Sequence, residues 1–371
     1  MRRRPSSSLH VFVAVVLAIG CDDGSAADAG RPEAWRDAGS VDAGGLARER
    51  IMYVSVGDAS RIAVVALADD GTMSARTAMD LALPANPGPL AYARRARRLY
   101  VGFDDGFGTI ELDAAGAMTL LGRTQRTGVP TYLAVARDDA VLVSAYFGED
   151  LVRSHDVSGA PPHTERSSVP TSDEPHCARV GPTGTRVYVP HRNGETTRWF
   201  DLLSDGSLAY VGELAAEAGA GPRHVDYTPD GRFAYVVNEQ GDSVSAHRVM
   251  SDGSLERFQT ISTLPAGANG ASNSGADVHV TPDGRFVYAS NRGHDSLAMF
   301  AVQSDGTLSS LGNVPTETRP REFDVSPDGR FVVAAGQDSG ALQSYRVESD
   351  GTLTSVDRLP VGPNLLWVVI D

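Results

Sequence analysis

The fold of this chain is decided by the stretch His224-Val-Asp-Tyr-Thr-Pro-Asp-Gly-Arg-Phe-Ala-Tyr-Val-Val-Asn238. Apolar and polar residues alternate on both sides of Pro-Asp-Gly, in which proline presets φ and glycine accepts a left-handed conformation. The stretch therefore predicts two antiparallel strands joined by a tight turn. The pattern returns at Val278–Asn291 and Phe323–Ala335, and weaker copies stand at 90–101, 132–143 and 178–189.

A second marker follows the strand pairs: glycine, then a small residue, then Leu or Met. It stands at Gly71, Gly116, Gly206, Gly253, Gly306 and Gly351. This spacing predicts seven units of about 46 residues, the length of a four-stranded propeller blade. We therefore expect residues 49–371 to form an all-β domain, a seven-bladed β-propeller of four-stranded antiparallel blades. Apolar runs at Ile51–Val56 and Leu366–Ile370 are expected to share one blade and close the ring.

Other fold classes are disfavoured by the same patterns. The sequence contains no sustained helical periodicity, which excludes Rossmann folds and βα barrels. No Gly-His or Trp-Asp pair recurs, which disfavours WD40 repeats.

The N-terminal segment has the composition of an export signal. Three arginines at 2–4 precede a short apolar run, Val11–Gly20, and Leu17-Ala-Ile-Gly-Cys21 resembles a bacterial lipoprotein signal. Residues 1–20 are thus expected to be a signal peptide and Cys21 to be lipidated, and the alternative is an ordinary secretory signal. Residues 21–48, rich in Asp, Ala and Gly, predict a flexible tether. The protein is expected to be an exported lipoprotein, anchored in the cell envelope by its lipid and facing the periplasm or the surface.

Composition and missing motifs exclude several functions. The 371 residues carry 33 Lys and Arg against 47 Asp and Glu, a net charge of −14, which argues against a nucleic-acid partner. Two cysteines exclude a disulfide scaffold and a cysteine-based zinc site. No Gly-x-Ser-x-Gly, His-Glu-x-x-His or EF-hand pattern occurs. We expect a monomer without metal or cofactor.

The strand pattern gathers polar residues at one mouth of the propeller. The first strand of each blade begins where the antiparallel second strand ends, so both positions face one funnel, and the Asp-Gly-Arg turns lie at the other mouth. The residues at these positions are Pro175–Cys177, Pro222–His224, Ala276–Val278, Pro320–Glu322, Pro190–Arg192, Asn238–Glu239, Asn291–Arg292 and Gln337–Asp338. They include the residue types used for proton transfer and for holding anions. The plainer interpretation is structural: Arg223 and Glu239 form a salt bridge and His176 caps a strand.

Three segments resemble the lactonase family of seven-bladed propellers, the 6-phosphogluconolactonase type that also includes fungal carboxymuconate-lactonizing enzymes. They are Gly221-Pro-Arg-His…Asn-Glu239, Asp277-Val-His…Ser-Asn-Arg-Gly-His-Asp-Ser296, and Pro320-Arg…Gln337-Asp-Ser339. The resemblance weakens before residue 175. It implies a catalytic set of His176, Arg223, Glu239 and Arg292 and no metal. We expect other residues of this region to bind substrate: His224, Asn238, Asp277, His279, Asn291, Arg321 and Gln337.

The sequence departs from the family pattern at two places, and both changes bear on substrate choice or on activity. Pro190-His191-Arg192-Asn193-Gly194 stands where many members have Pro-Asp-Leu-Gly, and Glu322 replaces a usual Asn.

The resulting hypothesis is hydrolysis of a small-molecule lactone. Arg223 and Arg292 hold the oxyanion or a substrate anion, Glu239 acts as base for water, and His176 transfers the second proton. A Glu between two Arg is a weak base, so the roles of Glu239 and His176 are open to reversal. Export favours an unphosphorylated sugar-type lactone. A non-catalytic surface propeller that binds a ligand or protein is the alternative, and a cycloisomerase is a third.

Overall fold

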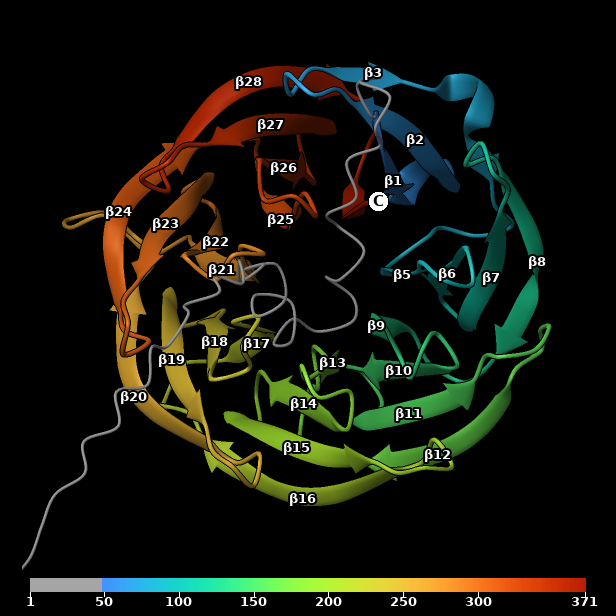
Figure 1. Ribbon diagram of the computed structural model, residues 1–371, viewed down its shortest axis with the longest axis horizontal. Helices are drawn as coiled ribbons and strands as arrows, with labels where there is room; N and C mark the ends of the chain where they lie inside the picture. The colour runs from blue at the N-terminus through green and yellow to red at the C-terminus, as the bar shows by residue number, and fades with distance from the viewer. Residues whose placement is uncertain (1–48) are drawn as a thin grey trace, which may run out of the picture.

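The computed structural model describes residues 49–371, and their elements are strands apart from two short 3-10 turns, η1 (Gly57–Ala59) and η2 (Thr77–Met79). The strands form seven sheets that radiate from one axis (Figure 1). The predicted all-β, seven-bladed propeller is therefore confirmed. The predicted signal peptide, the tether and the lipidated Cys21 lie outside the described residues. Within 49–371, no helix has the length and apolar character needed to cross a membrane.

Six blades follow chain order, with the first strand nearest the axis and the fourth at the outer wall (Figure 1). Blades 2 to 4 comprise β5 (Leu90–Ala93), β6 (Arg98–Phe103), β7 (Gly106–Leu112), β8 (Met118–Gln125), β9 (Pro130–Ala136), β10 (Val141–Tyr146), β11 (Leu151–Asp156), β12 (Thr164–Pro170), β13 (Arg179–Val180), β14 (Arg186–His191), β15 (Thr196–Leu202) and β16 (Leu208–Ala215). Blades 5 to 7 comprise β17 (Pro222–Tyr227), β18 (Phe233–Asn238), β19 (Ser243–Val249), β20 (Leu255–Ser262), β21 (Ser274–Val280), β22 (Phe286–Arg292), β23 (Ser296–Val302), β24 (Leu308–Pro315), β25 (Pro320–Val325), β26 (Phe331–Gly336), β27 (Ala341–Val347) and β28 (Leu353–Pro360).

Blade 1 closes the ring with both ends of the domain. Its innermost strand is β29 (Leu365–Ile370), which pairs antiparallel with β1 (Arg50–Val56) in a register that sets Met52 opposite Ile370. The outer strands are β2 (Arg61–Leu67) and β3 (Met73–Ala75), and β4 (Leu81–Ala82) also pairs with β2. The expected closure by the two terminal runs is confirmed, and it leaves no open gap between blades 1 and 7.

The Pro-Asp-Gly turns are held by local hydrogen bonds. In the turn before β18, Gly231 has φ +70° and its N–H donates to the Thr228 carbonyl over 2.8 Å. The Thr228 hydroxyl donates to Asp230 Oδ1 over 2.6 Å, and the Phe233 N–H donates to that hydroxyl. Because glycine alone adopts this φ without strain, the turn fixes the register of β17 against β18.

Tyrosines of the repeated strand pairs form hydrogen bonds with the repeated glycines of the neighbouring blade. The buried Tyr235 hydroxyl on β18 donates to the Gly306 carbonyl of the next blade over 2.9 Å. Tyr188 reaches Gly253 and Tyr288 reaches Gly351 in the same way and over the same distance. Each bond satisfies a buried hydroxyl and joins one blade to the next, so the repeated residues set the spacing of the ring.

Candidate active site

The inner strands of blades 5, 6 and 7 carry β-bulges at one mouth. Pro222 pairs with Asn238 and His224 with Val237, so Arg223 is an extra residue with no partner on β18. Arg321 is extra in the same way on β25. On β21 two residues, Ala276 and Asp277, stand between the pairs that Gly275 and Val278 form. Bulges redirect side chains, and these three put charged groups into the axial region.

Glu239 is the anionic centre of this mouth. It follows β18 and is only 9% exposed, and Arg223, on β17, is fully buried. Glu239 Oε2 lies 3.2 Å from Arg223 Nε, and Oε1 lies 3.2 Å from Arg292 NH2. Arg223 also donates to the Ala276 carbonyl, and Arg292 donates to the Gly275 carbonyl over 3.1 Å. Three of the four residues expected to be catalytic are thus in direct contact.

A third arginine reaches Glu239 from blade 4. Arg192 NH1 lies 3.1 Å from Glu239 Oε1, and its Nε donates to Glu174 over 2.8 Å. Its guanidinium stacks on the Phe147 ring, 4.9 Å from the centroid. Arg192 lies in the 190–194 segment, which the sequence marked as bearing on substrate choice or activity, and this contact ties that segment to the charged cluster.

The arginines decide the charge state of Glu239. Burial alone would raise the pKa of its carboxyl, but the charges of Arg223, Arg292 and Arg192 more than offset burial and hold the pKa below its ordinary value. Burial and the neighbouring Arg223 charge in turn lower the pKa of Arg292 to about 10. Glu239 is therefore an ionised counter-ion at neutral pH and a weak base.

The fourth expected residue, His176, lies next to His224. Their ring centroids are 5.1 Å apart at an interplanar angle of 60°. Burial, followed by the charge of Arg223, holds the pKa of His176 well below its ordinary range. Burial and Arg223 also lower the pKa of His224 to about 3, although its bond to Asp277 acts in the opposite direction. Both imidazoles are therefore neutral at physiological pH.

Asp277 is held by two histidines. His224 Nδ1 lies 2.8 Å from Asp277 Oδ1, and His279 Nε2 lies 3.1 Å from Oδ2. Burial opposes the charged form of both Asp277 and His279, but their attraction prevails. The pKa of Asp277 is held well below its ordinary value, and the pKa of His279 rises to about 9. Asp277 is therefore a carboxylate and His279 an imidazolium.

Glu322 lies beside this pair and is 2% exposed. Its Oε2 is 3.9 Å from His224 Nδ1, and its Oε1 is 3.4 Å from Arg223 NH2. Burial and the adjacent Asp277 charge raise the pKa of Glu322 well above its ordinary value, which favours the protonated form of its carboxyl.

The ligand-type atoms of His224, Asp277 and Glu322 lie within 4.8 Å of one another. Asp277 is already balanced by His279, and Glu322 contacts Arg223. The two carboxyl groups therefore already have partners on neighbouring side chains, and the arrangement gives no specific indication of a cation.

Three other residues expected to bind substrate form hydrogen bonds with residues outside the charged cluster of the mouth. The Asn238 amide donates to Ser243 and Ser245, and the Asn291 amide donates to the Thr263 carbonyl and to Ser296. The Gln337 amide donates to Asn364 over 3.0 Å. These three side chains tie the loops and strands that surround the mouth. Arg321 has a different environment: burial, followed by the charge of Arg223, lowers its pKa to about 10, and the nearby Glu322 and Glu239 act in the opposite direction.

Two aromatic residues that the sequence did not single out border the histidines. Tyr132 on β9 lies 5.3 Å from the His224 ring and 5.4 Å from the Trp367 ring, and Trp367 on β29 lies 6.0 Å from His224. These residues come from blades 3, 5 and 1, so the contacts cross the axis (Figure 1). They form an aromatic cluster in contact with His224. Both occupy ordinary inward strand positions, which give no sequence signal of this role.

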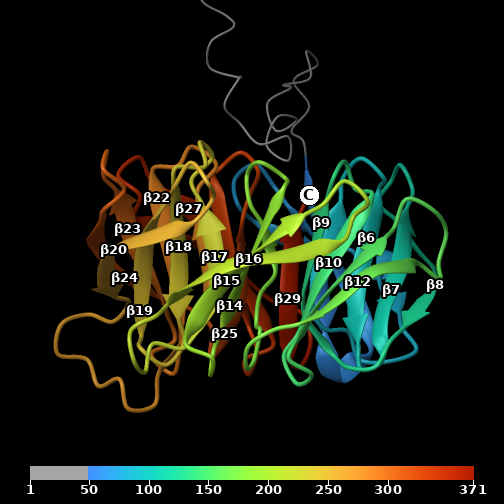
Figure 2. The same ribbon diagram turned by 90° about the horizontal axis from the view of Figure 1, so that it is seen from below.

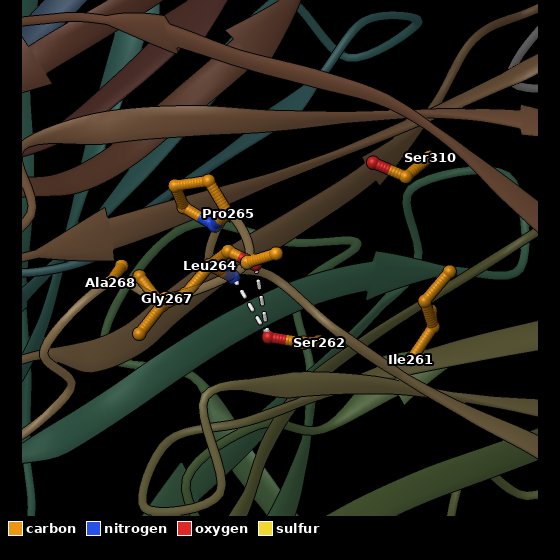
Figure 3. A pocket seen from close by; sticks show the side chains of 8 residues that line it. Ile261, Ser262, Leu264, Pro265, Gly267, Ala268 and Ser310 are labelled. Carbon is orange, nitrogen blue, oxygen red and sulfur yellow. Dashed lines mark hydrogen bonds between the residues drawn. The ribbon is translucent and has the colours of Figure 1, made fainter.

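A separate hollow of about 510 Å³ lies on the outer wall, where the loop after β20 meets β24 (Figure 3). Its walls are Ile261, Ser262, Leu264–Ala268 and Ser310, and none of the predicted site residues lines it. The lining is mainly small and apolar, so the hollow offers none of the chemistry of the axial mouth.

The comparisons with known proteins agree with this fold. The family model described as "Lactonase, 7-bladed beta-propeller" matches residues 50–370. A protein of Pectobacterium carotovorum named 6-phosphogluconolactonase is 32% identical over 287 residues, which cover 74% of this chain and 84% of the relative. A Yersinia pestis protein of the same name is 33% identical over the same shares.

Two solved structures have the same architecture. A Lactobacillus plantarum protein superimposes with a TM-score of 0.81 at 25% identity, over 87% of this chain and 99% of that one. The Pseudomonas aeruginosa periplasmic gluconolactonase gives a TM-score of 0.77 at 24% identity over the same shares.

The fold and the arginine-rich axial mouth define a seven-bladed propeller with a polar site on its axis. The chain belongs to the lactonase family of seven-bladed β-propellers.

Proposed function

We propose that this protein hydrolyses the ester bond of a small-molecule lactone at the mouth formed by His176, Arg223, Glu239 and Arg292. The observation that carries the proposal is the buried contact of Glu239 with Arg223 and Arg292, in a chain whose relatives at 32–33% identity are named 6-phosphogluconolactonase. Water attacks the carbonyl carbon, and the negative charge that develops on oxygen is stabilised by the arginines.

The substrate we propose is a sugar-type lactone outside the cytoplasm. The basis is the arginine-rich start at 2–4 and the Leu17–Cys21 segment. We propose lipidation of Cys21 and attachment to the cell envelope. Arg50, which begins β1, pairs with Asp328 in a Pro-Asp-Gly turn, so the described chain begins at the end of the ring opposite the site. The C-terminus lies at this same end of the ring (Figure 2), where the Asp371 N–H donates to the Ile51 carbonyl.

The test is a lactone panel offered to the purified full chain, with free aldonolactones and their phosphorylated counterparts side by side. Turnover of the free lactones that Arg223→Ala abolishes supports the proposal. Clear preference for the phosphorylated forms contradicts the proposed substrate, and no turnover of any lactone contradicts the proposed reaction.

The second candidate is a non-catalytic binding propeller. The observation that favours it is the saturation of Glu239 by three arginines, which makes it a weak base. On this account the mouth binds an anion and releases it unchanged. Calorimetric titration with a hydroxy acid, together with a lactone panel that shows no turnover, distinguishes this candidate from the lactonase.

A further inference from the structure

One position recurs at the mouth in four consecutive blades, where the second strand of each blade ends. It holds Phe147 after β10, Arg192 after β14, Glu239 after β18 and Arg292 at the end of β22. Each of these side chains contacts the next around the ring. The Arg192 guanidinium stacks on Phe147, and Glu239 Oε1 lies 3.1 Å from Arg192 and 3.2 Å from Arg292. The four side chains therefore form a continuous arc.

Exposure to solvent changes along this arc. The side chain of Arg192 is 28% exposed, whereas that of Arg292 is 7% exposed and that of Arg223 is fully buried. Arg192 and Arg292 contact the same oxygen of Glu239, so the exposed arginine lies beside the buried ones. A lactone whose ester reaches the buried arginines can therefore place its other groups beside Arg192.

Arg192 is held in place by Glu174. The Arg192 backbone N–H donates to the Glu174 carbonyl over 3.0 Å, and Arg192 Nε donates to Glu174 Oε2 over 2.8 Å. The Glu174 N–H in turn donates to Asp150 Oδ1 over 2.8 Å. The pair is fixed before any ligand arrives, which lowers the entropic cost of binding one.

Two polar atoms of this pair are available to a ligand. Arg192 NH2 is a donor and Glu174 Oε1 is an acceptor. Neither has a hydrogen-bond partner among residues 49–371, and neither is buried. An alcohol hydroxyl both donates and accepts hydrogen bonds, so a single hydroxyl can bond to both atoms.

The charges around Arg192 disfavour an anion at this place. Its guanidinium lies between the carboxylates of Glu174 and Glu239, which already balance its positive charge. A phosphate group bound to Arg192 would bring further negative charge next to both carboxylates, and like charges at short range repel. A neutral hydroxyl avoids this repulsion.

Two exposed amides continue the rim. Asn193 follows Arg192 and Gln240 follows Glu239, and the Gln240 amide donates to Asn193 Oδ1 over 3.3 Å. Each amide has both donor and acceptor atoms. The rim thus offers uncharged donors and acceptors for further hydroxyls next to the first pair.

We propose that Arg192 and Glu174 bind a hydroxyl group of the substrate and that Arg192 is a specificity-determining residue for uncharged, polyhydroxylated lactones. Arg192 NH2 donates to the hydroxyl oxygen, and the hydroxyl donates to Glu174 Oε1. The lactone as ligand rests on the proposed function, whereas the binding of a polyol ring at this pair does not.

The first test is a titration of the full chain with 1,5-anhydro-D-glucitol, followed by NMR of the ligand. This compound has the ring and hydroxyls of a sugar lactone but no ester, so its binding does not depend on lactonase activity. We expect the wild type to bind it. Arg192→Met, which keeps an apolar stem over Phe147, and Glu174→Ala should each weaken binding at least about tenfold, as the loss of a hydrogen bond to a charged group does.

The matched control is Arg198→Met, on β15 of the same blade. Arg198 Nε lies 2.7 Å from Glu213, its guanidinium stacks on Tyr210, and its side chain is 26% exposed. It has the same kind of contacts as Arg192 but contacts none of the residues of the arc, so wild-type affinity is expected. A wild type that does not bind the polyol, or an Arg192→Met variant that binds as tightly as wild type, overturns the proposal.

The second test is kinetic. D-glucono-1,5-lactone and δ-valerolactone share a six-membered lactone ring, and only the first carries hydroxyls. We expect Glu174→Ala to raise KM for gluconolactone at least about tenfold with kcat within about twofold, and to leave kcat/KM for valerolactone within about twofold of wild type. A wild-type KM for gluconolactone, or an equal loss with both lactones, overturns the proposal. A wild type inactive on every lactone refutes the proposed function instead, and the titration still decides the subsite.

Discussion

His224 on β17 and Asp277 on β21 are joined by a 2.8 Å hydrogen bond between neighbouring blades. Asp277 stands in a bulge, and His224 directly follows one. Because bulges re-aim side chains at the point where pairing stops, two residues 53 positions apart meet in the axial region. A β-bulge also places Arg223 in this region, where its guanidinium contacts Glu239 and Glu322.

The first prediction concerns the ion pairs of Glu239. Replacing Glu239 by Gln leaves Arg223 and Arg292 buried without a counter-charge, and the free energy of unfolding should fall by about 3 kcal/mol. Urea unfolding measures this. The control is Glu174→Gln, because Glu174 is partly exposed and Arg192 is its one ion-pair partner among residues 49–371; loss of this pair should cost less than about 1 kcal/mol. Equal stability of Glu239→Gln and wild type would contradict the ion-pair account.

The second prediction concerns activity. His176→Ala and Glu239→Gln should each lower the lactonase kcat at least about tenfold, the first by removing the base and the second by releasing the arginines. Initial rates at saturating lactone measure this in variants shown to be folded by circular dichroism. Wild-type rates in both variants would show that the axial mouth is not the catalytic site.

The third prediction concerns the proton on Glu322. Burial and Asp277 raise its pKa well above the ordinary value. The unfolded chain therefore loses this proton at lower pH than the folded chain, and stability falls as pH rises between the two pKa values. Glu322→Gln removes this dependence, so the variant should gain stability relative to wild type from pH 5 to pH 8. Thermal unfolding across that range is the measurement, and parallel curves for the two proteins would count against a protonated Glu322.

The fourth prediction concerns acid lability away from the site. Burial, followed by the charges of Arg126 and Arg153, lowers the pKa of His155 to about 3, and neither of its ring nitrogens has a hydrogen-bond partner among the described residues. The unfolded chain takes up this proton below about pH 6.5. The stability contributed by the neutral ring is thus present above that pH and is lost as pH falls towards 3.

At pH 5 this difference amounts to about 2 kcal/mol. His155→Leu should therefore be more stable than wild type at pH 5 by more than it is at pH 8, as measured by urea unfolding. A difference that does not change with pH would show that His155 does not contribute to acid lability.

The fold was predictable because its determinants are local and repeated. The turn Thr228–Gly231 and its copies specify hairpins through φ and side-chain caps, and their spacing specifies the number of blades. Ring closure could be predicted from the two apolar runs at the ends of the domain, because a propeller that is not closed exposes a strand edge.

The site was predictable in part. Strand direction alone places His176, Arg223, Glu239 and Arg292 at one mouth, and the structure brings the last three into contact. The bulges were missed because an extra residue in one strand depends on pairing across the sheet, which a single sequence does not display.

The contact of Arg192 with Glu239 was also missed. It joins segments of two blades, and only a departure from the family pattern at 190–194 marked the position. Tyr132 and Trp367 resemble any inward residue of a strand, so their contacts across the axis carry no local signal.

The most direct test of the central claim is an assay of the ring opening of free aldonolactones, in which the protons released by hydrolysis are measured. The full chain is compared as wild type and as the Arg223→Lys variant. Lysine keeps the charge but loses the fork that spans Glu239, Glu322 and the Ala276 carbonyl. We predict hydrolysis by the wild type and a fall of at least about a hundredfold in kcat for the variant, the scale of losing one oxyanion donor. A wild type that releases no protons from any lactone, or an Arg223→Lys variant as fast as wild type, would contradict the account.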